Sequence, residues 1–169
     1  MRDAIRSALI TIAAAVALPG AALADQGLYG GFGASQVEFK PDRGPSFNPT
    51  ALTGFVGKEI NANLAAELRL SAGLGSDSNV EIDHTVGAYV RGILPLAREV
   101  SLYGLLGVTS SKVNFRGGGG SVSDTGLSYG IGADIGVGKS VSLGVEWVSL
   151  MRPSGYELNA LSVLAKFRF

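Results

Sequence analysis

The chain of 169 residues has no cysteine, one histidine and one tryptophan, and its formal net charge is zero. The missing cysteines exclude disulfides, thiol catalysis and cysteine metal sites. The basic residues are spread along the chain, whereas a nucleic-acid partner would require clustered cations opposite its phosphates. A chain of this length is expected to form one domain. Because its cations are not clustered, we expect that domain to bind no nucleic acid.

The N-terminal segment 1–24 has the pattern of an export signal. Arg2 and Arg6 give it a positive start, residues 8–18 are almost all apolar, and it closes on Ala-Leu-Ala, a small-x-small cleavage pattern. A membrane-spanning helix needs about 20 apolar residues, so a retained anchor is disfavoured. We expect cleavage after residue 24. The mature domain 25–169 keeps 12 Lys and Arg, 13 Asp and Glu, and 24 of the 25 glycines.

The mature sequence alternates between apolar and polar residues, which is the period of a β-strand with two unlike faces. Five segments follow this period: 64–71, 86–93, 127–137, 141–147 and 161–169. Three more are strand-like with less decided faces: 28–39, 50–60 and 101–114. The sequence therefore predicts eight strands.

Strand and loop lengths favour a membrane barrel. A tilted strand needs about ten residues to cross the apolar band of an outer membrane, whereas globular strands average about five or six. Short and long connections alternate, so the tight turns and both termini would share one rim. The short connections are 60–63, 95–100 and 138–140, and the long ones are 40–49, 73–83, 115–124 and 151–158. We predict an all-β, eight-stranded antiparallel up-and-down transmembrane β-barrel.

Three pieces of sequence carry a family resemblance: Gly-Leu-Tyr-Gly-Gly-Phe-Gly at 27–33, Gly-Lys-Glu-Ile-Asn-Ala-Asn-Leu-Ala-Ala-Glu-Leu-Arg at 57–69, and the last strand ending in Phe169. The chain resembles the small outer-membrane barrels of Gram-negative bacteria, of the OmpA, OmpX and opacity-protein type. The resemblance implies export through the periplasm and residence in the outer membrane. It also implies that Phe169, with Phe167, is the signal read by the outer-membrane assembly machinery.

Charged residues fall on the polar faces of the predicted strands, which must point inward because lipid offers no hydrogen bonds. They are Glu67, Arg69, Arg91, Asp134, Glu146, Lys166 and Arg168. We expect an interior salt-bridge network that fills a narrow barrel, with a gate or proton relay as the alternative. A hairpin centred near Asn79 would place Glu67 about opposite Arg91, within reach of an ion pair.

Other motifs are weaker. His84 is the only histidine, and no His-x-Ser motif begins there, so a solvated rim histidine is favoured over a catalytic one. The segment 77–81 imitates the start of a calcium loop, but Ile82 replaces the glycine of the tight turn. Residues 117–120 are four glycines without the Gly-Lys-Ser or Gly-Lys-Thr of a phosphate loop. We therefore assign no catalytic, cofactor or metal residues.

The sequence favours a non-enzymatic outer-membrane barrel without a wide pore, with a structural or surface-interaction role in its loops. Expected partners are outer-membrane lipid and lipopolysaccharide, the assembly machinery, periplasmic chaperones and host surface ligands. The alternatives are a small ion channel, a lipid-modifying barrel enzyme and a soluble lipocalin-like barrel with the apolar faces turned inward.

Overall fold

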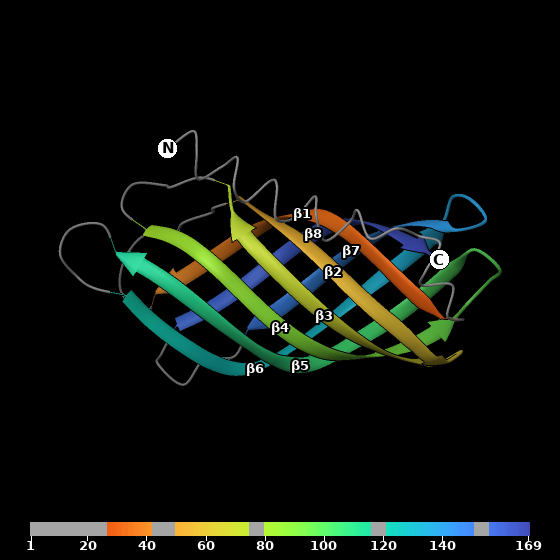
Figure 1. Ribbon diagram of the computed structural model, residues 1–169, viewed down its shortest axis with the longest axis horizontal. Coiled ribbons are helices and arrows are strands. Elements are labelled where there is room, and N and C mark those ends of the chain that lie inside the picture. The colour runs from red at the N-terminus through yellow and green to blue at the C-terminus, as the bar shows by residue number, and fades with distance from the viewer. Residues whose placement is uncertain (1–26, 42–49, 75–79, 116–120, 151–155) are drawn as a thin grey trace.

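The structure is a closed barrel of antiparallel strands, and each strand pairs with its neighbour in sequence (Figure 1). This computed structural model describes residues 27–41, 50–74, 80–115, 121–150 and 156–169. The strands are β1 (Leu28–Pro41), β2 (Thr50–Asn61), β3 (Leu64–Gly73), β4 (Val80–Pro95), β5 (Val100–Phe115), β6 (Ser121–Gly136), β7 (Val141–Leu150) and β8 (Tyr156–Arg168). β1 pairs with β8 and closes the sheet. The predicted eight-stranded antiparallel barrel is confirmed.

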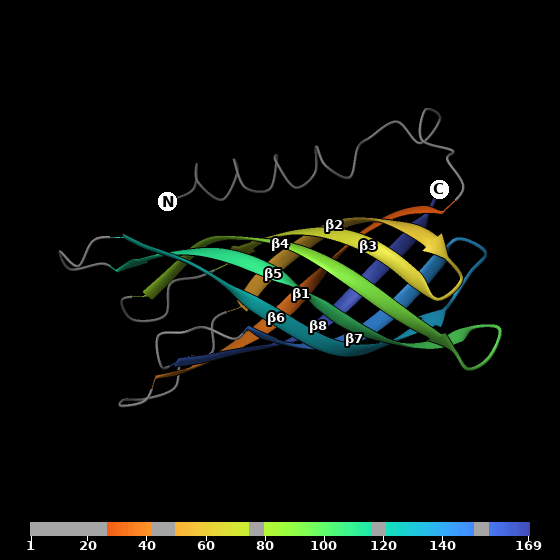
Figure 2. The ribbon, with the colours of Figure 1, turned by 90° about the horizontal axis from the view of Figure 1, so that it is seen from below.

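The two ends of the barrel differ. The connections 62–63, 96–99 and 137–140 lie together with the C-terminus at one end (Figures 1 and 2). We call this the short-turn end. The other four connections join the strands at the opposite, long-loop end. The predicted alternation of short and long connections is therefore present in the structure.

Three strands begin earlier than their sequence pattern predicts. β4 begins at Val80, β6 at Ser121 and β8 at Tyr156, inside segments that we expected to be loops. The reason is backbone pairing, because Val80 lies opposite Phe115, and Val122 lies opposite Val113. Backbone hydrogen bonds form whatever the side chains are, so the ladder continues beyond the stretch in which the apolar-polar period is clear.

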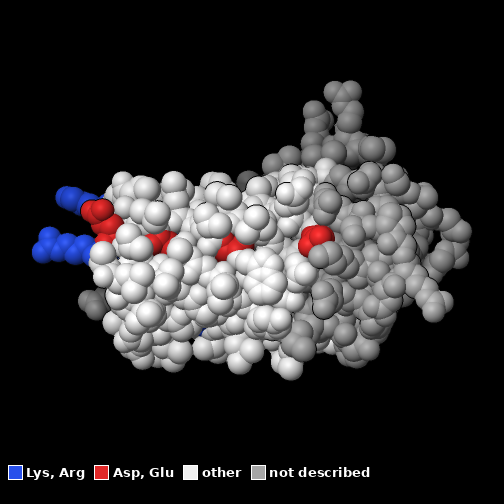
Figure 3. Space-filling view, turned by 180° about the vertical axis from the view of Figure 1, so that it is seen from behind, with Lys and Arg blue, Asp and Glu red and all other residues white. Residues whose placement is uncertain are grey.

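The apolar faces of the strands point outward. Side chains on this outer face are largely exposed, among them Leu68, Val90, Leu106, Ile131, Leu143 and Val163. The inner face carries polar and charged side chains, which are buried. Figure 3 shows a wall that is mostly uncharged, with basic side chains projecting from the short-turn end. The lipocalin-like alternative required the opposite orientation of the faces and is wrong.

In the described part of the chain, no helix has the length and apolar character that crossing a bilayer requires.

Three inward tyrosines each lie directly across the ladder from an inward glycine. The pairs are Tyr29 with Gly57, Tyr89 with Gly107 and Tyr103 with Gly132. A Cβ atom at Gly57 or at Gly132 would lie 2.3 Å from the Cζ atom of the facing tyrosine. The glycines thus leave room for each ring to lie flat along the inner wall, a pairing that also fixes the register of the two strands.

Two glycines of β5 test this packing. A Cβ at Gly107 would lie 2.2 Å from the backbone oxygen of Ala88, whereas at outward Gly104 its nearest neighbour is the Gly130 oxygen at 3.9 Å. We expect Gly107→Ala to lower the free energy of unfolding by about 1–3 kcal/mol through overpacking. Gly104→Ala should change it by less than about 0.5 kcal/mol. Urea titration in lipid vesicles measures both, and equal effects would contradict this account of the inner wall.

Candidate functional site: the interior polar network

Six of the seven charged residues expected inside the barrel are buried there. They are Glu67 and Arg69 on β3, Arg91 on β4, Asp134 on β6, Glu146 on β7 and Lys166 on β8. Each is at most 8% exposed. Strand alternation brings them together, because inward positions on neighbouring strands face the same narrow lumen. With Tyr29 and Tyr103 they form what we call the interior network.

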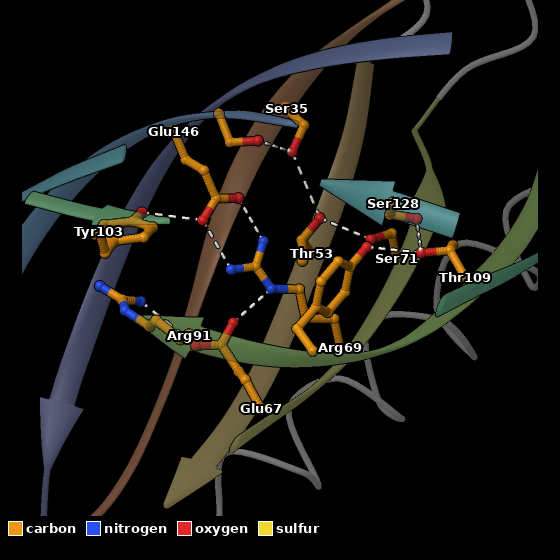
Figure 4. Close-up of polar contacts among 12 residues, drawn as sticks. Ser35, Thr53, Glu67, Arg69, Ser71, Arg91, Tyr103, Thr109, Ser128 and Glu146 are labelled. Atoms are coloured by element: carbon orange, nitrogen blue, oxygen red, sulfur yellow. Dashed lines mark hydrogen bonds and ion pairs between the residues drawn. The ribbon is translucent and has the colours of Figure 1, made fainter. Parts of the chain in front are cut away.

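Arg69 lies at the centre of the interior network (Figure 4). Both of its terminal nitrogens donate to the two carboxylate oxygens of Glu146, with Nη2 at 2.7 Å from Oε2. Its Nε donates to Oε1 of Glu67 at 2.5 Å. The guanidinium also lies 5.0 Å from the ring centroid of Tyr89. A bidentate pair of this kind fixes the direction as well as the strength of the contact.

Arg91 continues the chain of charges. Its Nη2 donates to Oδ2 of Asp134 at 2.5 Å, and its Nη1 lies 3.4 Å from Oε2 of Glu67. Its guanidinium covers the ring of Tyr103 at 3.5 Å from the centroid. Lys166 donates to the same oxygen of Asp134. The charges therefore alternate in the order Glu146, Arg69, Glu67, Arg91, Asp134 and Lys166, and the three acids balance the three bases.

Tyrosine hydroxyls supply further donors to the acids. Tyr29 donates to Oε2 of Glu67 at 2.9 Å, and Tyr103 donates to Oε2 of Glu146 at 3.0 Å. Alternation alone does not identify these two tyrosines, because both lie in segments whose apolar and polar faces are less decided. Each tyrosine lies opposite a glycine, Gly57 or Gly132. A tyrosine paired with a glycine on the next strand is the sequence signal that could have indicated an inward ring.

Hydroxyl side chains form two further chains on the inner wall. Ser35 bonds to Ser162 at 2.8 Å and approaches Thr53 at 3.4 Å, while Thr53 bonds to Ser71 at 2.8 Å (Figure 4). On the facing wall, Thr109 bonds to the Tyr89 hydroxyl at 2.7 Å and to Ser128 at 2.6 Å. The apolar-polar period places Ser71, Ser128 and Ser162 on the polar faces of their strands, but it does not predict these hydroxyl chains, which depend on contacts between strands.

The interior network lies between two hollows. A cavity of about 70 Å³ is lined by Ser35, Thr53, Arg69 and Glu146 among others. A wider vestibule of about 480 Å³ opens at the short-turn end, and Asp134 and Lys166 are among the residues that line it. Charged side chains thus contact both hollows and fill the lumen between them.

Arg168 does not join the interior network. Its side chain is 52% exposed and pairs with Glu59 at 3.1 Å. Arg168 lies on the same face of β8 as Lys166, but it is the last residue of the strand and lies at the rim of the barrel. The expectation that it belongs to the interior is therefore corrected, because alternation gives the face of a strand and not the depth in the barrel.

The register between β3 and β4 also differs from the expectation. Glu67 lies opposite Tyr89, and Arg91 lies opposite Ala65. The Glu67–Arg91 contact exists, but it is diagonal across the ladder. The hairpin is centred one residue earlier than Asn79, which moves the pairing of the two strands by two residues.

The predicted assembly residues lie at the end of β8. Phe167 is partly buried and stacks on Phe32 with ring centroids 6.0 Å apart. Phe169 is 49% exposed, and its backbone N–H donates to the oxygen of Leu28 at 3.1 Å. Both aromatic side chains therefore lie on or near the outer wall at the short-turn end.

The remaining candidates are His84, the calcium-like segment and the glycines at 117–120. His84 is an exposed residue of β4 whose ladder partner is Lys112. Positions 77 and 79 of the calcium-like segment, the side chain of Glu81 and the glycines at 117–120 lie outside the described residues. Among the described residues, no group of three or more His, Cys, Asp or Glu could hold a metal ion.

Comparison with known proteins gives a family match. The model of the outer membrane protein beta-barrel domain matches residues 7–169. A search of curated proteins gives no match.

Solved structures of small barrels are similar to this chain. Ail, the attachment invasion locus protein of Yersinia pestis, is 20% identical with a TM-score of 0.66, over 85% of this chain and 99% of Ail. Ail in complex with the heparin analogue sucrose octasulfate is 21% identical with a TM-score of 0.64, over 85% and 99%. Neisserial surface protein A is 16% identical with a TM-score of 0.69, over 84% and 97%. At these identities the likeness concerns the fold.

Removing one partner from the interior network tests its role in stability. Glu146→Leu leaves the Arg69 guanidinium without its bidentate acceptor, and we expect the free energy of unfolding to fall by about 3–5 kcal/mol. Adding Arg69→Met to that variant should recover most of the loss, because no unpaired charge remains buried. Urea titration of the folded fraction in lipid vesicles measures both.

Arg168→Ala is the matched control, because it breaks a half-exposed pair at the rim and should cost at most about 1 kcal/mol. Equal losses for Glu146→Leu and Arg168→Ala would show that the interior pair is not important for folding.

Proposed function

Because the chain belongs to the family of the outer membrane protein beta-barrel domain, we propose that it is a non-enzymatic barrel whose lumen is closed and whose long loops carry a surface-interaction role. The observation that supports the closed lumen most directly is the interior network. Arg91 is 1% and Glu146 0% exposed, and eight strands enclose little more space than such side chains occupy. The lumen is therefore structural, and the loops are the parts left for recognition.

The orientation follows from the two ends. Tight turns at the short-turn end suit the periplasm, and longer connections suit the cell surface. Loops on a rigid scaffold commonly carry recognition. The names of the structural neighbours, attachment invasion locus protein and surface protein, are consistent with such a role. Host surface ligands are thus the partner class that we propose, together with outer-membrane lipid and lipopolysaccharide.

Export and assembly complete the proposal. We assign residues 1–24 to a cleaved signal and 25–169 to the barrel of a Gram-negative outer membrane. Periplasmic chaperones would accompany the chain, and the assembly machinery would read Phe167 and Phe169. Two aromatic side chains close to the outer wall at the end of the last strand support that assignment.

A small ion channel is the second candidate. The observation that favours it is the pair of hollows on either side of the interior network. Conduction would require the Arg69–Glu146 pair to separate, which would leave two buried charges uncompensated. Steady, reproducible openings of refolded protein in planar bilayers would place this candidate first.

The surface role can be tested on whole cells. One of the Ail structures contains a heparin analogue, so a sulfated glycan is a suitable probe. We expect cells that display this protein to bind a heparin-coated surface several-fold better than cells displaying a variant with residues 42–49 replaced by Gly and Ser. The connection 62–63 at the short-turn end, replaced in the same way, is the control and should leave binding unchanged.

Binding is measured by counting adherent cells at matched amounts of folded protein in the membrane. If the 42–49 variant binds as well as the unchanged protein, this loop does not carry recognition of sulfated glycans. A failure of the unchanged protein to exceed cells without it would contradict the proposed ligand class.

A further inference from the structure

The outer wall of the barrel has a groove where two glycines face outward. The groove has a volume of about 750 Å³ and passes over Gly92 and Gly104. A Cβ at Gly92 would have no atom within 4 Å, and one at Gly104 only the Gly130 oxygen at 3.9 Å. Leu94 and Leu102 stand beside it and are 58% and 43% exposed. Missing side chains, flanked by large apolar ones, therefore produce the hollow.

The groove runs obliquely across the wall. It follows one row of ladder partners, which are Gly92, Gly104, Ile131, Trp147 and Leu161 on β4 to β8. Gly92 lies three residues from the short-turn end of β4, whereas Leu161 lies seven residues from that end of β8. Four spacings of about 4.8 Å make the row about 19 Å long. Strand tilt thus takes the groove from near the short-turn end up toward the long-loop end.

A polar pocket adjoins the upper end of the groove. This pocket of about 270 Å³ is lined by Gln36, Glu38 and Asn159, and it shares Trp147 and Leu161 with the groove. The ladder continues in the same direction, since Leu161 lies opposite Gln36, and Asn159 lies opposite Glu38. An apolar track and a polar pocket therefore meet at one tryptophan.

Trp147 is held at this junction by a neighbour. Its ring makes an edge-to-face contact with Tyr129 at 6.0 Å between centroids. Tryptophan and tyrosine prefer the boundary between lipid tails and head groups, where one part of the ring is apolar and another is wet. The contact thus marks the height at which a bound lipid would change from tail to head group.

The lining of the polar pocket selects the kind of head group. Gln36 and Asn159 offer carboxamides, and Glu38 offers a carboxylate. Carboxamides both donate and accept hydrogen bonds, and a carboxylate accepts them. Groups that both donate and accept hydrogen bonds suit the hydroxyls of a sugar, which do the same.

We propose that the β4–β8 wall binds one sugar-headed membrane lipid, with its head group at Gln36, Glu38 and Asn159 and an acyl chain in the groove over Gly92 and Gly104. This inference rests on the proposed function in one respect, namely that the barrel lies in a membrane with its long-loop end outward. It adds the lipid class and the place on the wall.

The single tryptophan of the chain reports on this site directly. The full mature barrel is refolded into phosphatidylcholine vesicles that contain a minor fraction of a glycosyl diacylglycerol with brominated acyl chains, which quench tryptophan on contact. The comparison uses the same fraction of brominated phosphatidylcholine. We expect the glycosyl lipid to quench Trp147 several-fold more strongly. Equal quenching by the two lipids would overturn the inference.

Two variants locate the effect. Gly104→Leu fills the groove in a position where space is open, and Asn159→Leu removes a polar group from the pocket, so both should abolish the preference for the glycosyl lipid. Ala88→Leu is the matched control, because Ala88 is exposed on the outer face of β4 but does not line the groove. It should keep the preference, and a preference retained by Gly104→Leu would contradict the proposed site.

The test separates this inference from the proposed function. Inserted protein is recognised by its altered electrophoretic mobility before boiling. Trp147 quenched by neither lipid in inserted protein would mean that this wall does not face acyl chains, which contradicts both the site and the membrane orientation. Quenching without preference contradicts the lipid site alone.

Discussion

The hydrocarbon of a membrane offers no hydrogen bonds, and this constraint explains most of the structure. The backbone N–H and C=O groups of a sheet are all paired only if the last strand bonds to the first, so that no edge is left open. The β1–β8 pairing does this along nearly all of β1. The same constraint sends charged side chains inward, where they must satisfy one another. Closure of the sheet and neutrality of the lumen are therefore two results of one cause.

The lumen is neutral because acids and bases are equal in number and also because they alternate in space. Three acids and three bases alternate, and Glu67 holds Arg69 and Arg91 together. Tyrosines extend the network and need glycines across the ladder to make room for their rings. The same residue type has the opposite effect outside, where Gly92 and Gly104 leave a hollow in the wall. Glycine thus shapes both faces of the barrel wall.

Much of the site follows from alternation alone, which is enough to place Glu67, Arg69 and Glu146 on the inner face. Alternation could not place Arg168, because depth depends on where the strand leaves the wall. Nor could it find Tyr103, since small residues on both faces of that segment hide the period. The pairing of β3 with β4 depends on the geometry of their loop. The first residues of β4 and β6 are held by backbone pairing, which depends on no particular side chains and therefore leaves no mark in the sequence.

The most direct test of the account asks which face of the wall meets lipid. The chain has no cysteine of its own, so single cysteines at Ile131 and Leu143 can be probed in vesicles with a charged, water-soluble maleimide supplied on both sides of the membrane. We predict that both resist it, while a cysteine at exposed Ala62 in a short turn reacts quickly. All three should react once the protein is unfolded in detergent. Labelling of Ile131 and Leu143 as fast as Ala62 in intact vesicles would contradict the account.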